Sequence, residues 1–452
     1  MVNNTLTNID DMKSVALDMT PGRKYMSAIL FQQGISQNTN KIKRIYYQNL
    51  EDLNYLFDYY CMTPIAIQSL HNLLDLEHSE TELKNSNLNS INNQTMDIIY
   101  EQELITILNF VYQITKKDIN ISANIYELNL FKFEFFNSEI KLKNIISKEE
   151  FNKKRKTILD KNSSKEFEYE LPTYNDVLDA FMMAGIFNKE QEKVFTEIIN
   201  EAESYISKPK SYTIALDTNS LIFNFPNGLK QPLEKKNKER LFKNLPLIPI
   251  GYFVPPRVKE ELYNQSNRKL SNDMIKIYES ELKIINIFNQ LTLKARKFQL
   301  GSNVLNRIRN YEIYSENIQS SKKGLNDSAI VEEIFSYGKY NNSNMKLISN
   351  DDGIVSSAKT AGVDSVRINK HYNLENEYLI TWKQFIDLLY HLSVIFIDLT
   401  IESGEPVTIK GIWSGKNGTN WENQQVKIET KSKNLQNQLY EYLMPIRRFN
   451  EN

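Results

Sequence analysis

The chain has 452 residues, of which 41% are hydrophobic and 11% aromatic, so most of it is expected to fold around an apolar core rather than stay disordered. One cysteine, Cys61, excludes a disulfide framework and any zinc site built from cysteines. The net charge of −1 at pH 7 conceals an uneven distribution, because residues 205–370 carry 26 lysines and arginines against 16 acidic residues. A basic middle between acidic flanks is typical of a polyanion-binding protein, although a solvated lysine-rich surface produces the same pattern.

The first part of the chain, 1–205, predicts a mixed α+β domain. Apolar residues at helical spacing predict helices over 50–76 and 96–117. Alternating β-branched and aromatic residues predict strands over 121–145. The charged stretch 148–166 predicts a linker to further helices.

The middle part, 206–370, alternates between strand and helix patterns. Strands are predicted over 212–216, 247–255, 345–349 and 364–369, and helices over 257–264, 271–300, 324–338 and 353–362. Such alternation predicts an α/β domain in which helices cover both faces of a parallel sheet.

The last part, 371–452, predicts a small extension made of a helix and a β-hairpin. The helix is predicted over 382–399, which holds the longest apolar run of the chain; the run is too short to span a membrane and contains charged residues, so a core helix is expected. Asn417 and Gly418, between two alternating runs, predict the hairpin turn. No signal peptide is visible, and a cytoplasmic protein without membrane contact is therefore expected.

Acidic residues lie where the predicted strands end or where helices follow them. Asp217 ends the first strand, and Asp351 follows the strand KLIS. Glu261 lies in the helix after the second strand, and Asp327 opens another helix. Because ligands of open α/β sheets bind outside the carboxyl ends of the strands, these four carboxylates are expected to converge. Placement of Asp217 and Asp351 on opposite faces of the sheet would refute this site.

Clustered carboxylates repel one another unless a cation lies between them. Mg²⁺ or Mn²⁺ is the predicted cofactor, because both ions prefer oxygen ligands. Such an ion polarises a phosphodiester and lowers the pKa of a bound water. Asp352 is a further candidate ligand beside Asp351, and Glu260 competes with Glu261 for the same role. The four histidines are scattered, which disfavours a zinc site.

The segments IALDTNSLI, VPPRVKEEL, NDSAIVEEIFSYG and LISNDDGIVSSAKTAGVDSVRI resemble, in this order, the PIN-domain nuclease family. The resemblance covers about residues 212–369, roughly a third of the chain. It implies a PIN-like parallel sheet flanked by helices, and metal-dependent endonucleolytic cleavage of RNA, less often of DNA. The catalytic and metal-binding residues that it implies are Asp217, Glu261, Asp327 and Asp351. The long flanks of this chain depart from the short single-domain members and do not fit a simple toxin.

Other polar residues near the acids are candidates for supporting roles. Asn219 and Ser349 are predicted to orient the acids through hydrogen bonds. Basic residues close to the acids, or in the long insertion after the second strand, are predicted to contact a phosphate backbone: Arg257, Lys259, Arg307, Arg309, Lys322 and Lys323. RNA is the expected partner and single-stranded DNA the second choice, while 1–205 is a candidate surface for a homo-oligomer or a protein partner.

Three functions stay open on the sequence alone. The first is a metal-dependent endoribonuclease, which the presence of all four acids favours. The second is a non-catalytic nucleic-acid-binding or assembly protein on the same scaffold, with Asp217 and Asp327 serving only as helix N-caps. The third is a structure-specific DNA nuclease, a class that usually carries more acidic residues. Resemblance in fold does not by itself establish function.

Overall fold

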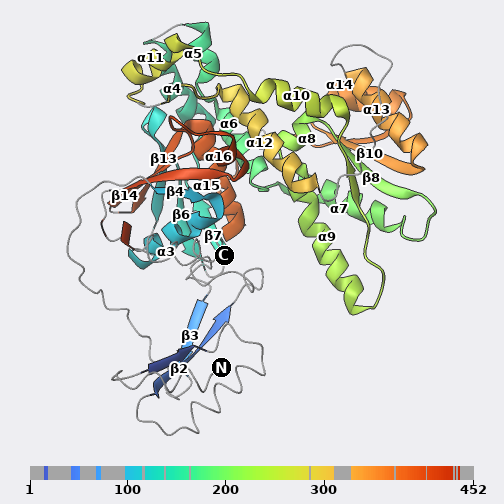
Figure 1. Ribbon diagram of the computed structural model, residues 1–452, viewed down its shortest axis with the longest axis horizontal. Helices are drawn as coiled ribbons and strands as arrows, with labels where there is room; N and C mark the ends of the chain where they lie inside the picture. Colours follow the sequence, from blue (N-terminus) through green and yellow to red (C-terminus); the bar gives the residue numbers. More distant parts are fainter. Residues whose placement is uncertain are drawn as a thin grey trace.

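Figure 1 shows the chain as a computed structural model. The structure describes residues 15–18, 42–50, 68–72, 97–114, 118–136, 139–161, 164–284, 287–309, 327–370, 373–403, 405–430, 433 and 436–437. Two larger sheets, each with its own helices, make up most of the described part, and helix α12 lies between them (Figure 1).

The middle part of the chain forms a parallel sheet of four strands. These are β8 (Ser211–Leu216), β9 (Gly251–Phe253), β10 (Ser343–Ser349) and β11 (Asp364–Arg367). Their order in space is β11-β10-β8-β9, and all neighbouring pairs are parallel. The predicted parallel sheet is therefore confirmed. The two central strands read as apolar runs because helices cover a parallel sheet on both faces.

Seven helices of the described residues belong to this middle part: α8 (Thr218–Ile222), α9 (Phe225–Phe242), α10 (Pro256–Ser266), α11 (Asn272–Glu281), α12 (Leu293–Ile308), α13 (Asp327–Tyr340) and α14 (Asp352–Thr360). The single helix predicted over 271–300 is wrong, because Ser271 and Thr292 each cap a separate helix with a side-chain oxygen. The strand predicted over 247–255 shrinks to β9, since prolines on either side cannot donate to the ladder.

The second large sheet joins strands that precede the parallel-sheet part to strands that follow it. Its eight strands are β4 (Asp97–Tyr100), β5 (Ile119–Ala123), β6 (Leu128–Phe136), β7 (Glu139–Lys143), β12 (Glu377–Thr381), β13 (Asp398–Ser403), β14 (Glu405–Lys410) and β15 (Gln425–Thr430). Their order is β12-β7-β6-β5-β13-β14-β15-β4, with antiparallel neighbours throughout. The strands predicted over 121–145 are confirmed. The predicted 371–452 extension is not separate. Its strands complete the sheet that begins in residues 1–205, because β13 pairs with β5.

The hairpin predicted at Asn417 and Gly418 differs in detail. Strands β14 and β15 do pair antiparallel, but their connection contains the short helix α16 (Gly418–Glu422). The Asn417 side chain accepts a hydrogen bond from the main-chain N–H of Asn420, which makes Asn417 an N-cap instead of a turn residue. The short side chain of asparagine suits both a turn and a helix N-cap, and Asn417 takes the second role.

The remaining elements revise the expectations for the first 205 residues. Helical elements are η4 (Glu101–Glu103), α3 (Leu104–Ile114), η5 (Asn124–Tyr126), α4 (Lys148–Leu159), α5 (Lys165–Glu170), α6 (Tyr174–Met183) and α7 (Lys189–Glu203). The expected linker 148–166 is mostly helix, since Ser147 caps α4. Strands β1 (Val15–Asp18), β2 (Ile42–Leu50) and β3 (Gln68–Asn72) form a third sheet. The helix predicted over 50–76 is wrong at β3, and most of its other residues lie outside the described ones.

Helix α15 (Trp382–Phe396) is the core helix that the apolar run predicted. All of its residues from Phe385 to Phe396 are buried. Within the described part of the chain, no helix has the length and apolar character to cross a membrane. Helix α15 packs against the eight-stranded sheet (Figure 1).

Helix α12 ties the two large sheets together. Arg296 is buried, and its Nη1 donates to the carbonyls of Val394 (2.9 Å) and Ile395 (3.1 Å) at the end of α15. On the other side, a Cβ on Gly301 would lie 3.1 Å from Ile222 and 3.2 Å from Leu262 of the parallel-sheet part. The position of α12 is therefore fixed from both sides.

The first strand after α15 begins on a buried carboxylate whose ionisation is unfavourable. Burial raises the pKa of Asp398 to about 6, against the opposing effects of Lys410 and Asn124. An acid with a raised pKa in the folded state reduces stability as the pH rises from its unfolded value through its folded value. Asp398→Asn is therefore expected to raise the free energy of unfolding by about 2 kcal/mol at pH 8 and to have little effect at pH 4.

Urea unfolding of wild type and Asp398→Asn at pH 4, 6 and 8 measures this difference. Asp273→Asn is the matched control, because Asp273 is exposed on α11 and should shift no midpoint at any pH. A gain for Asp398→Asn that is the same at pH 4 and pH 8 would contradict the expected titration.

Candidate active site

Asp217 lies where β8 ends and α8 begins. It has extended backbone angles and caps α8, so the strand delivers its side chain to the carboxyl edge of the sheet. Its Oδ1 accepts hydrogen bonds from the N–H (2.7 Å) and the hydroxyl (2.5 Å) of Ser220. Its Oδ2 accepts from the hydroxyl of Ser349 at 2.5 Å. The carboxylate is only 4% exposed and is held at both oxygens.

Asp351 lies at the same edge, one strand away. In the register of β8 and β10, Leu216 faces Ile348, so both strands end at the same level. Asp351 caps α14 through the N–H of Gly353 at 2.7 Å, and its own N–H donates to the Ser349 hydroxyl at 2.9 Å. Ser349 thus joins the two acid-bearing turns, and the two aspartates do not lie on opposite sides of the sheet.

Asp327 and Glu261 approach this pair from two helices. Asp327 is the first residue of α13, and its Oδ2 lies 3.1 Å from the point where a Cβ would stand on Gly353. Oδ1 of Asp351 lies 3.1 Å from the same point, so these two carboxylates are neighbours. The Thr218 hydroxyl donates to Oε2 of Glu261 at 2.5 Å, which connects α10 to the turn after β8. All four predicted acids are therefore gathered at one edge.

The electrostatics of the acids reflects their proximity. Burial raises the pKa of Asp217 to about 6, although hydrogen bonds from Ser220 and Ser349 oppose this, and the charge of Asp351 adds to the rise. The pKa of Asp327 is raised by burial and then by the charges of Asp351 and Glu261. The charge of Asp351 therefore raises the pKa of both Asp217 and Asp327, as expected of carboxylates that lie close together.

The two alternatives left open by the sequence differ in their surroundings. Glu260 is exposed, whereas Glu261 is half-buried and bonded to Thr218. Asp352 is 71% exposed, and its Oδ1 pairs with Nη1 of Arg367 at 2.7 Å. Glu261 and Asp351 are therefore the better placed of each pair.

The supporting roles fall partly on residues that the sequence did not single out. Ser349 holds Asp217, as predicted. Asn219 forms no side-chain hydrogen bond within the described part of the chain, and its neighbours Thr218 and Ser220 hold the acids instead. The run of small polar residues after Asp217 was the available signal, but it does not reveal which of them face the acids.

The predicted phosphate contacts are scattered. Arg257 is bound to the buried Glu333, since its Nε lies 3.1 Å from Oε1 and its main-chain N–H donates to Oε2 at 3.3 Å. The charge of Arg307 acts on Glu101 and His391 of the eight-stranded-sheet part, away from the acids in the fold. Arg309 is exposed at the same end of α12, and Lys259 is half-buried on α10. Lys322 and Lys323 lie outside the described residues.

The acids gather without forming a ready-made metal cage. Among the described residues, no group of three or more histidine, cysteine, aspartate or glutamate side chains is arranged closely enough to hold a metal ion. The donor set itself fits Mg²⁺ or Mn²⁺, because it consists of carboxylate oxygens and excludes softer ligands. Oδ1 of Asp217 already accepts two hydrogen bonds from Ser220, whereas Oδ2 accepts only the one from Ser349, so one lone pair of Oδ2 remains for a ligand.

Comparison with known proteins adds no assignment. No protein-family model matches the sequence, and a search of curated proteins found no match. The function therefore has to be argued from the gathered acids and their surroundings.

Proposed function

We propose that the chain is a metal-dependent endonuclease that hydrolyses phosphodiester bonds of RNA at Asp217, Glu261, Asp327 and Asp351. The observation that carries this proposal is the meeting of Asp327 and Asp351 at Gly353, with Asp217 bound to the same serine as Asp351. Within the described part of the chain, none of the four acids forms an ion pair that would offset its charge, and four such acids at a sheet edge are unfavourable for folding alone, which favours a functional reason for them. The parallel sheet agrees with the PIN-like fold that the resemblance implies.

The residues around the acids have separate roles in the proposed reaction. A bound Mg²⁺ or Mn²⁺ would polarise the phosphodiester and lower the pKa of the attacking water. Ser220 and Ser349 hold the Asp217 carboxylate in one orientation. Thr218 does the same for Glu261. The exposed position of Asp351 leaves room for the substrate on its open side.

A second candidate function is a nucleic-acid-binding scaffold without catalysis. Both oxygens of Asp217 are already hydrogen-bonded, as they would be in an N-cap that serves only the fold. The cytoplasmic location, and a homo-oligomer or protein partner for the first 205 residues, stay predictions.

Cleavage of labelled single-stranded RNA by the full chain tests the proposal. Cuts are expected with Mg²⁺ or Mn²⁺ and none with EDTA, because the acids need a cation to act. Matched single-stranded DNA runs in parallel and tests the alternative substrate. RNA that is bound but intact with either ion would contradict the nuclease and favour the scaffold, and equal cutting in EDTA would contradict the metal-dependent mechanism.

A further inference from the structure

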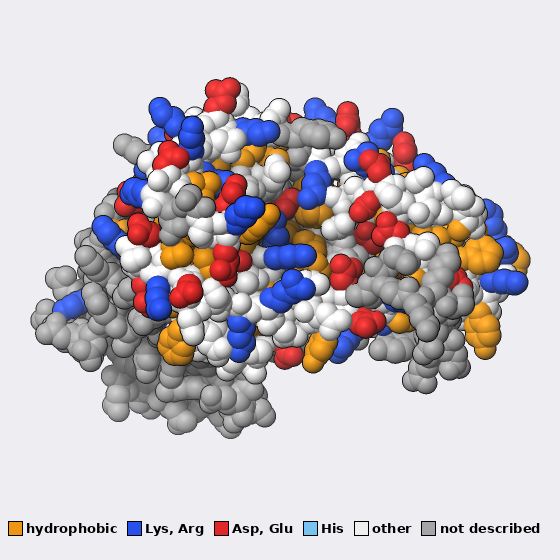
Figure 2. Space-filling view, turned by 90° about the horizontal axis from the view of Figure 1, so that it is seen from above, with side chains coloured by type: hydrophobic (Ala, Val, Ile, Leu, Met, Phe, Trp, Pro, Cys, Tyr) orange, Lys and Arg blue, Asp and Glu red, His pale blue; other side chains and the backbone are white. Residues whose placement is uncertain are grey.

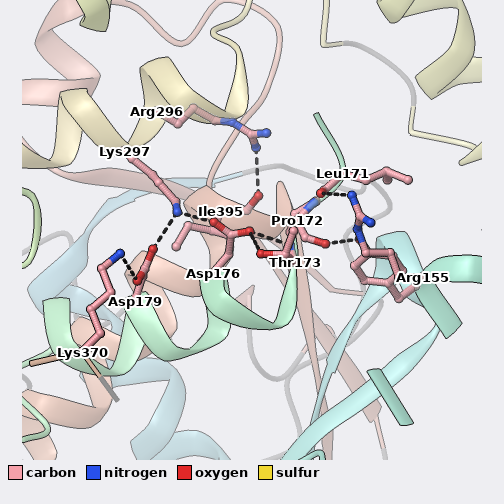
Figure 3. A network of polar contacts seen from close by, with 11 residues as sticks. Arg155, Leu171, Pro172, Thr173, Asp176, Asp179, Arg296, Lys297, Lys370 and Ile395 are labelled. Carbon is pink, nitrogen blue, oxygen red and sulfur yellow. Dashed lines mark hydrogen bonds and ion pairs between the residues drawn. The ribbon is translucent and has the colours of Figure 1, made fainter. Parts of the chain in front are cut away.

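A cavity of about 440 Å³ lies outside the acid site, among α4, α5, α6 and the start of α12. Three cationic side chains line it, Arg155, Lys294 and Lys297, together with the carboxylates of Glu168 and Asp176. Figure 3 shows Arg155 on one side and Lys297 on the other, with the start of α6 between them. Its volume is in the range of small-molecule sites.

One of the carboxylates is already neutralised within the protein. Lys297 forms ion pairs with Asp176 and with Asp179, the latter at 2.8 Å. Asp179 also pairs with Lys370 at 3.4 Å, and Asp176 accepts hydrogen bonds from Thr173 (Figure 3). Two lysines thus balance two aspartates, so this network adds no net charge to the cavity.

The remaining charges leave an excess of positive charge. Arg155 donates to the carbonyls of Glu168 (2.6 Å) and Leu171 (3.5 Å), which carry no formal charge. Its Nε is buried and has no hydrogen-bond partner among the described residues. Lys294 is exposed, and within the described part of the chain its Nζ contacts only the ring of Phe298, whose centroid lies 5.5 Å away. Against these two cations stands the single carboxylate of Glu168, so the cavity favours an anion.

An aromatic side chain stands at the same cavity. Tyr169 contributes to the lining and is 79% exposed, so its ring is open to a ligand. Exposed aromatic rings beside cations are the arrangement with which proteins stack nucleobases and hold the attached phosphates. Figure 2, which views the molecule from above, shows lysine and arginine side chains interspersed with acidic ones across the middle of that face.

We propose that this cavity binds a nucleotide, with its phosphate beside Arg155 and Lys294 and its base on Tyr169. The ligand is a 5′-monophosphate, either free or at the end of a strand. The proposal does not depend on chemistry at the four acids, because it concerns binding at different elements.

The test is a binding measurement in EDTA with the full chain. Fluorescence anisotropy compares 3′-labelled single-stranded RNA that carries a 5′-phosphate with the same RNA carrying a 5′-hydroxyl. Adenosine 5′-monophosphate, uridine 5′-monophosphate and inorganic phosphate serve as competitors. Tyr169→Ala and Lys294→Gln are each expected to weaken binding of the 5′-phosphorylated ligand about tenfold, and both side chains are exposed, so the fold should persist. Lys276→Gln, a cation 77% exposed on α11, is the matched control.

The outcomes separate the two sources of the ligand. If the 5′-phosphorylated RNA binds more tightly, and both variants but not Lys276→Gln reduce this binding, the ligand is the 5′ end of a strand. Binding of the free monophosphates that both variants weaken, without an effect of the RNA end, supports a free nucleotide. Unchanged affinity in Tyr169→Ala and Lys294→Gln overturns the proposal, and so does weakened RNA binding that neither the 5′-phosphate nor any nucleotide affects.

Discussion

Asp217→Asn is expected to reduce metal-dependent RNA cleavage by at least about a thousandfold. Asp217 is the most buried of the four acids and is fixed at both oxygens, so its carboxylate is held in one orientation. The asparagine amide has almost the same shape but brings no negative charge to a cation. Single-turnover cleavage of labelled RNA in Mn²⁺, measured beside RNA affinity in EDTA, separates lost chemistry from lost binding.

The same substitution should not weaken the fold at neutral pH. Burial raises the pKa of Asp217 to about 6, so the ionised form destabilises the protein progressively as the pH rises above its unfolded value. Removing that charge is expected to offset the loss of the hydrogen bond from Ser349, so the free energy of unfolding at pH 8 should change by no more than about 1 kcal/mol. A folded, stable and inactive variant would then place the loss in the chemistry.

Asp352→Asn is the matched control for this experiment. Asp352 follows Asp351 directly, but it is exposed and paired with Arg367, so its loss should change the cleavage rate by no more than about twofold. Wild-type activity in Asp217→Asn would show that the four acids are not the site. Equal losses in both variants would point to the net charge of the surface instead of a defined centre.

The parallel sheet was predictable because its signals are local. Each strand is a short apolar run bounded by Pro, Gly or a capping acid, and β8, β9 and β10 are each followed directly by a helix. The eight-stranded sheet was not predictable in the same way. Its middle pair, β5 and β13, joins residues 119–123 to 398–403, and no local pattern records a pairing over such a separation.

The candidate site could be predicted down to its acids but not to the groups that hold them. Asp217 and Asp351 follow from the rule that sites form at the carboxyl ends of strands. Which residue after Asp217 turns toward it depends on the first turn of α8, where the third residue of the run, Ser220, faces back to the cap and Asn219 does not. The commitment of Arg257 to Glu333 is likewise invisible in the sequence, because the two lie on different helices.

Gly411→Ala is expected to lower the free energy of unfolding by about 3 kcal/mol or more, or to prevent folding. A Cβ at this position would lie 2.3 Å from the carbonyl carbon of Ser393, 2.4 Å from its oxygen and 2.4 Å from the nitrogen of Val394. These are main-chain atoms of α15, so no side-chain rotation relieves the overlap. Either the core helix or the chain after β14 must move.

Gly418→Ala is the matched control, because it adds the same methyl group at the start of α16, where nothing lies within 4 Å. It is expected to be neutral or to stabilise by up to about 1 kcal/mol, since alanine restricts the unfolded chain more than glycine does. Urea midpoints and soluble yield of the two variants measure the contrast. If Gly411→Ala were as stable as Gly418→Ala, the main chain at Gly411 would not pack closely against Ser393 and Val394 of α15.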